Sequence, residues 1–88
     1  MRIYAIKDDK SQTWQGSYAF VNDAIAVREF DSAFKQGKLG LMSQYPEDFA
    51  LYCLGSYEDS TGKLTGDLKL VKNFADFAQE GNNNGGNR

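Results

Sequence analysis

The sequence contains no histidine, and only one cysteine and one proline among its 88 residues. Without histidine, the chain lacks both the usual general base at neutral pH and the commonest metal ligand. Cys53 alone can form neither an intrachain disulfide nor a zinc site of several thiolates, and its apolar neighbours favour an inert buried thiol. We therefore predict no catalytic residue, no metal site and no cofactor, and we do not expect an enzyme.

The remaining patterns that might suggest catalysis are weak. Adjacent acidic residues occur at 8–9, 47–48 and 58–59, each time at a predicted turn, which favours solvated carboxylates over a general acid and base. Residues 60–63 (STGK) lack the first glycine of a phosphate-binding loop, and Leu64 stands where that loop needs Ser or Thr. This segment is predicted to be a hairpin turn.

The chain also lacks a strong net charge and a long apolar run. Ten Lys and Arg against 12 Asp and Glu give a net charge of −2, which argues against a strongly basic nucleic-acid binder and against a polyanionic tail. No span of about 20 apolar residues and no signal-like segment is present, so we expect no membrane contact and a reducing cytoplasm.

The length favours one small domain, predicted at residues 1–80. A domain of this size buries only about 60–65% of its unfolded surface, so oligomerisation would add to its stability. The Asn- and Gly-rich segment 81–88 has no apolar residue and is predicted to be disordered.

The densest apolar run, residues 49–57, organises the predicted fold. It is followed by the turn formers 59–62 and an alternating segment at 63–72, a pattern that predicts an antiparallel β-hairpin. Both faces of the run are apolar, which predicts a central strand covered on both sides by helices or by another subunit. Gly55 indicates a bulge, a close backbone approach, or a plain small residue at a packing contact.

The flanking segments complete an α+β prediction. Asn22 is a good N-cap for a helix at 23–36, whose apolar residues recur at intervals of three and four. A homodimer or higher oligomer is expected to cover the second sheet face, and a short helix predicted at 74–80 is the alternative cover. The predicted fold is a small antiparallel sheet in the chain order strand, helix, strand, strand, with the long helix on one face and the order of strands within the sheet left open.

The other segments are predicted as one strand and two connectors. Residues 2–7 form the first strand, and residues 38–44 form a loop or a short helical turn. Residues 9–18 are predicted to be a loop anchored by Trp14, which we expect to plug the domain or a subunit contact rather than to stack on a ligand.

Aromatic residues interleaved with cations are the main signal for binding. Proteins that bind single-stranded nucleic acid combine a cationic track with aromatic platforms for the bases. Tyrosines in the core or at a dimer contact would give the same sequence pattern, so that alternative stays open. The candidate DNA-binding residues are Arg2, Tyr4, Lys7, Tyr52, Tyr57, Lys63, Lys69 and Lys72.

Residues 45–52 (YPEDFALY), 54–57 (LGSY) and 59–62 (DSTG) resemble the small non-structural protein of gokushoviruses, which are single-stranded DNA phages of the Microviridae. The resemblance extends to the strand at 3–6 and to the helix that Asn22 opens. It implies a DNA-binding or replication-associated accessory protein in the cytoplasm of the bacterial host, and it supplies no catalytic residue.

Two functional hypotheses follow. The first is a bacteriophage protein that binds single-stranded DNA non-enzymatically during viral DNA replication or the switch to packaging. The second is a homo-oligomeric module that recruits viral or host replication proteins without contacting DNA. DNA titrations at several salt concentrations distinguish the two, because binding to phosphates weakens as salt rises.

Overall fold

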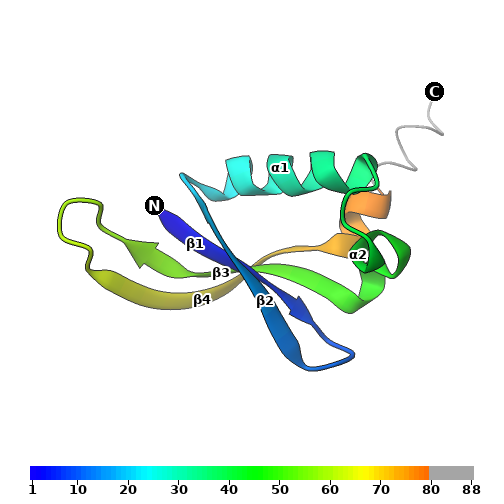
Figure 1. The fold of residues 1–88 in the computed structure, drawn as a ribbon, viewed down its shortest axis with the longest axis horizontal. Helices are drawn as coiled ribbons and strands as arrows, with labels where there is room; N and C mark the ends of the chain where they lie inside the picture. The colour runs from blue at the N-terminus through cyan, green and yellow to red at the C-terminus, as the bar shows by residue number, and fades with distance from the viewer. Residues whose placement is uncertain (80–88) are drawn as a thin grey trace.

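The computed structural model describes residues 1–79 as a four-stranded antiparallel sheet with helices packed against it (Figure 1). The order of strands in the sheet is β2-β1-β3-β4. The elements in chain order are β1 (Arg2–Asp8), β2 (Thr13–Phe20), α1 (Asp23–Lys35), α2 (Leu41–Gln44), the 3₁₀ turn η1 (Pro46–Asp48), β3 (Phe49–Tyr57) and β4 (Leu64–Asn73). Residues 74–79 are helical. The α+β class is confirmed.

Strand β2 replaces the predicted loop at 9–18. It pairs antiparallel with β1 from Asp8 opposite Thr13 to Arg2 opposite Phe20. The alternation signal is absent because β2 is a largely exposed edge strand, and because Gly16 lies beside a register shift at a φ of +130°. The predicted order strand, helix, strand, strand is therefore wrong: a second strand precedes the helix.

The hairpin of β3 and β4 is confirmed, and of the alternatives left open at Gly55 the structure has a bulge with a close backbone approach. This glycine has a φ of +148°, and a Cβ atom there would collide with the backbone carbonyl oxygen of Thr65. Tyr52 lies opposite Ala5 of β1, whereas Gly55 lies opposite Ile3, so β3 has one residue more than β1 between these pairs. Because the extra residue resets the alternation, Tyr57 shares a face with Tyr52.

Helix α1 begins and ends close to its predicted limits. The Asn22 side chain accepts a 2.9 Å hydrogen bond from the backbone N–H of Ile25, as an N-cap should. Ala26 and Phe30 are its buried residues. The ring of Phe30 lies edge-on to that of Tyr18 from β2, with centroids 5.1 Å apart. The apolar stripe of α1 therefore covers one face of the sheet.

Helical residues 74–79 join α1 on the same face instead of covering the other one. The ring centroids of Phe30 and Phe74 are 6.2 Å apart, and those of Phe34 and Phe77 are 6.0 Å apart. One buried cluster unites these helices with β1 and β3: Tyr4, Ile6, Ala26, Phe30, Phe49, Leu51, Cys53, Phe74 and Phe77. The alternative in which this short helix covers the second sheet face is thus wrong, and Cys53 is a buried core residue as expected.

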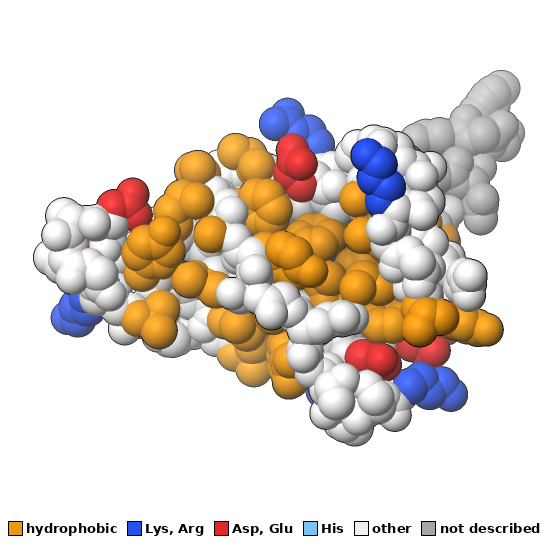
Figure 2. All heavy atoms as spheres, viewed as in Figure 1, with side chains coloured by type: hydrophobic (Ala, Val, Ile, Leu, Met, Phe, Trp, Pro, Cys, Tyr) orange, Lys and Arg blue, Asp and Glu red, His pale blue; other side chains and the backbone are white. Residues whose placement is uncertain are grey.

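The molecule is elongated, with extents of 48 × 30 × 20 Å. In Figure 1 the distal end of the β3–β4 hairpin projects beyond α1 at the left. Figure 2 shows hydrophobic side chains across much of the middle of this view and charged side chains mainly towards its edges. No described helix is long and apolar enough to cross a membrane. Residue 80 of the predicted short helix and the predicted tail at 81–88 lie outside the described residues.

Candidate nucleic-acid interface

Asp23, the first residue of α1, draws together side chains from both β1 and β4. Its Oδ1 accepts hydrogen bonds from Tyr4 Oη at 2.6 Å and from Arg2 Nε at 3.1 Å. Its Oδ2 accepts from Lys69 Nζ at 2.9 Å. We call Arg2, Tyr4, Asp23 and Lys69 the Asp23 cluster. It fixes the N-terminal end of α1 against the sheet.

The cluster sets the protonation of its own members. Hydrogen bonds from Tyr4 and then Lys69 lower the pKa of Asp23 to about 2, with Arg2 adding to the effect and partial burial opposing it. Burial raises the pKa of Tyr4 to about 12, and its hydrogen bond to Asp23 acts in the same direction. At neutral pH the cluster therefore holds an ionised carboxylate and a protonated phenol that donates to it.

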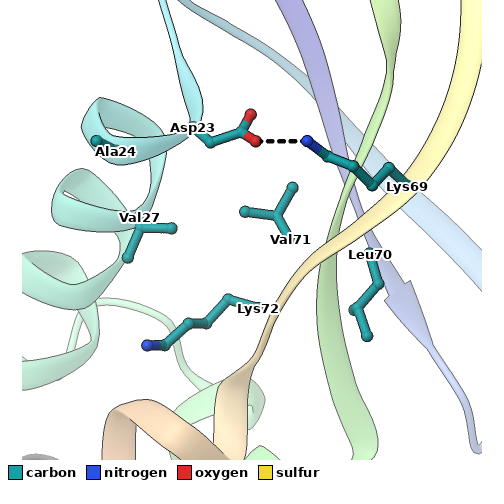
Figure 3. A pocket seen from close by; sticks show the side chains of 7 residues that line it. All are labelled: Asp23, Ala24, Val27, Lys69, Leu70, Val71 and Lys72. Carbon is teal, nitrogen blue, oxygen red and sulfur yellow. Dashed lines mark hydrogen bonds and ion pairs between the residues drawn. The ribbon is translucent and has the colours of Figure 1, made fainter.

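A groove of about 600 Å³ runs beside this cluster, between α1 and β4. Its lining residues are Asp23, Ala24, Val27, Lys69, Leu70, Val71 and Lys72 (Figure 3). Figure 3 shows Val27 and Val71 between the pair of Asp23 and Lys69 and the side chain of Lys72. The ammonium of Lys72 lies 5.8 Å from the ring centroid of Phe77. We call this site the α1–β4 groove.

The α1–β4 groove brings together three of the predicted DNA-binding residues. Lys69 and Lys72 line it, and Arg2 reaches its edge through Asp23. Among Arg2, Asp23, Lys69 and Lys72, three are cations and one is a carboxylate, and Asp23 pairs with both Arg2 and Lys69. Each lysine ammonium carries three donors, and Asp23 accepts from Lys69, so that lysine retains donors for an anion.

The predicted aromatic residues do not lie in this groove. Tyr4 is fully buried, so its ring is not available to a base. Tyr52 lies opposite Leu70 on the sheet face away from α1, and Tyr57 shares that face. Tyr52 and Tyr57 therefore do not share a surface with Lys69 and Lys72.

The two remaining candidates, Lys7 and Lys63, also lie apart from the groove. Lys7 is on the face of Tyr52, with its ammonium 5.9 Å from the ring centroid of Trp14 and 3.6 Å from a carboxylate oxygen of Asp9. The Trp14 ring lies edge-on to Tyr52 at 5.0 Å. Lys63 is exposed in the β3–β4 turn.

The sequence placed Asp23 only as the first residue of the predicted helix at 23–36. Its partners Tyr4 and Lys69 are 19 and 46 positions away along the chain. A local sequence pattern does not predict contacts between residues so far apart in the chain. Only the docking of α1 across β1 and β4 reveals the cluster.

Comparison with protein families matches residues 1–77 to the family described as Phage ORF5 protein. Searches of curated proteins and of solved structures find no significant match.

Proposed function

Because the chain belongs to the Phage ORF5 protein family and is a bacteriophage protein, we propose that it binds single-stranded DNA non-enzymatically through the α1–β4 groove. The observation that carries the proposal is the presence of Lys69 and Lys72 in the lining of one groove of an otherwise acidic protein, with Arg2 bound to the Asp23 carboxylate beside them. The resemblance of residues 45–62 to the gokushovirus non-structural protein supports a role in replication of a single-stranded genome or in the switch to packaging.

The charge of the groove limits the strength of this binding. Three cations neutralise about two or three phosphates, and each contributes about −0.7 to the slope of log K against log salt on single strands. We therefore expect a slope of roughly −1.4 to −2.1 and modest affinity. Phosphate contacts do not distinguish bases, so the affinity should be nearly independent of sequence.

Titration of a fluorescent oligothymidine at several salt concentrations tests the proposal. Lys69→Gln and Lys72→Gln should each weaken binding and reduce the slope by about 0.7. Lys38→Gln is the matched control, because Lys38 is exposed after α1, outside the groove lining, and its replacement makes the same change in net charge. The control should bind like the unmodified protein.

The face of Tyr52 provides an internal comparison. Since Tyr52 lies on the opposite side of the sheet from the groove, Tyr52→Ala should leave DNA affinity and salt slope unchanged. Absence of binding by the unmodified protein at low salt would reject the function. Binding that neither groove lysine affects would place DNA elsewhere.

A specific observation also favours the second hypothesis, a protein-interaction module. The sheet face opposite α1 exposes large apolar side chains, and contacts between proteins are the usual role of such surfaces. This surface lies on the opposite side of the sheet from the groove, so the DNA titration still distinguishes this hypothesis, which excludes DNA contact, from the first.

A further inference from the structure

The sheet directs one set of side chains away from α1, and we call this surface the open face. Cross-strand partners share a face, so Tyr52 lies there with Leu70, and Trp14 lies there with Lys7. Alternation along β4 adds Leu68 and Leu64. The large apolar side chains of the open face include Ile3, Trp14, Tyr52, Tyr57, Leu64, Leu68 and Leu70.

The open face is exposed in the single chain. The exposed fractions are 44% for Trp14, 67% for Leu64, 61% for Leu68 and 47% for Leu70. An antiparallel sheet with one face in water ordinarily places polar side chains on that face. Here the outward positions of β3 and β4 carry leucine and tyrosine instead, which is typical of a surface that is covered in the assembled protein.

Charge limits what can cover the open face. Among the side chains that strands β1 to β4 direct to this side, Lys7 is the only charged one, and Asp9 lies 3.6 Å from its ammonium. A nucleic acid requires a track of cations, and a charged peptide requires an opposite charge; this face has neither. A neutral, apolar protein surface matches it.

We propose that the open face is a two-fold symmetric interface with a second copy of this chain. A symmetric dimer needs only one self-complementary patch, and a patch with one balanced charge meets its own copy without strong repulsion. The aromatic pair of Trp14 and Tyr52 supplies rigid anchors of the kind that dominate interface energies. Two sheets would then pack face to face at about 10 Å.

The area is sufficient for such a dimer. Four strands spaced about 4.8 Å apart and about eight residues long cover roughly 500 Å² in plan, hence roughly 1,000 Å² for two copies before the relief of the side chains is counted. Specific interfaces begin at about this size. Leu70 belongs to both the groove lining and the open face, but Lys69 lies on the α1 side of the sheet and Lys72 also lines the groove there, so this inference stands independently of DNA binding.

Sedimentation velocity over a range of protein concentrations tests the interface. The unmodified chain should form dimers, and Leu68→Lys should raise the dissociation constant at least about tenfold, because the symmetric contact buries the new charge twice. Leu41→Lys is the matched control: Leu41 is 63% exposed, close to the 61% of Leu68, but lies in α2. The control should dimerise normally.

Trp14, the only tryptophan, provides a second readout. Its quenching by acrylamide should decrease as the protein is concentrated, and in Leu68→Lys it should stay high over the range in which the unmodified chain dimerises. A monomer at high micromolar concentration would overturn the interface. So would a dimer that Leu68→Lys affects no more than Leu41→Lys does. Lys72→Gln should dimerise normally, so failure of this proposal and failure of DNA binding are distinguishable.

Discussion

The hydroxyl of Tyr4 donates a 2.6 Å hydrogen bond to Oδ1 of Asp23, joining the interior strand β1 to the first turn of α1. Tyr4 is fully buried, whereas Asp23 is partly exposed and also accepts from Arg2 and Lys69. The pair therefore connects the core to the edge of the α1–β4 groove. A tyrosine predicted to stack on DNA instead holds the helix that forms one wall of the groove.

Replacing Asp23 with asparagine should destabilise the protein in a pH-dependent way. The folded pKa of Asp23, about 2, lies below the ordinary value of 3.8, so its stabilisation is present above about pH 4 and is lost as pH falls towards 2. With partial solvent screening, we expect Asp23→Asn to lose about 1–2 kcal/mol at pH 7 and to approach the unmodified protein near pH 2. Urea unfolding across this range measures the difference.

Asp67→Asn is the control for this experiment, because Asp67 is an exposed β4 carboxylate outside the cluster. It should change the free energy of unfolding by less than about 0.5 kcal/mol. A constant difference between Asp23→Asn and the unmodified protein from pH 7 to 2 would contradict the assigned role of the carboxylate.

Replacing Tyr4 with phenylalanine tests the same bond from the other side. The folded pKa of Tyr4, about 12, lies above the ordinary value of 10, so its stabilisation is complete below pH 10 and is lost as pH rises towards 12. Tyr4→Phe should cost about 1.5–3 kcal/mol at pH 7, because the lost hydrogen bond has a charged acceptor. The gap between the two proteins should narrow above pH 10.

Denaturant unfolding at pH 7, 10 and 11 provides this measurement, with Tyr45→Phe as the control. Tyr45 is exposed, so its change should be nearly neutral. Equal stability of Tyr4→Phe and the unmodified protein at pH 7 would mean that the hydrogen bond contributes nothing net.

Phe30→Ala should cost about 3–5 kcal/mol, a large fraction of the stability of a small domain. Phe30 is buried in α1 and contacts rings from β2 and from the helical segment at 74–79, so truncation leaves a cavity between three elements. Leu41→Ala, at an exposed site, should cost less than about 0.5 kcal/mol. Thermal and urea unfolding report both, and a loss below about 1 kcal/mol for Phe30→Ala would refute this packing.

Gly55→Ala should destabilise the hairpin by about 3 kcal/mol or more. Its backbone φ is one that other residues rarely adopt, and the added methyl group would meet the Thr65 carbonyl oxygen. Gly66→Ala is the matched control, because Gly66 lies directly opposite in β4 and an added Cβ there has only an ordinary contact, at 4.0 Å. Similar losses for the two variants, measured by urea unfolding, would contradict a special requirement at Gly55.

The bulge at Gly55 separates what the sequence predicted about the candidate site from what it did not predict. The glycine and the apolar run were visible in the sequence, and they predicted β3 and its turn. Strict alternation would place Tyr52 and Tyr57 on opposite faces, whereas the bulge places them together and away from Lys69. A single extra residue in one strand reverses every later side chain, and that shift depends on which residues the neighbouring strand offers as partners.

The sequence by itself determined the local elements of this protein: α1, from the Asn22 cap and its apolar spacing, and the β3–β4 hairpin, from its run and turn. Such signals arise between residues a few positions apart. Tertiary structure alone decided that β2 is an edge strand, that helical residues 74–79 pack beside α1, and that Asp23 gathers partners up to 46 positions away. These outcomes depend on which surfaces meet when the sheet forms. Backbone pairing and burial then stabilise contacts between segments far apart in the chain, and no local sequence pattern predicts such contacts.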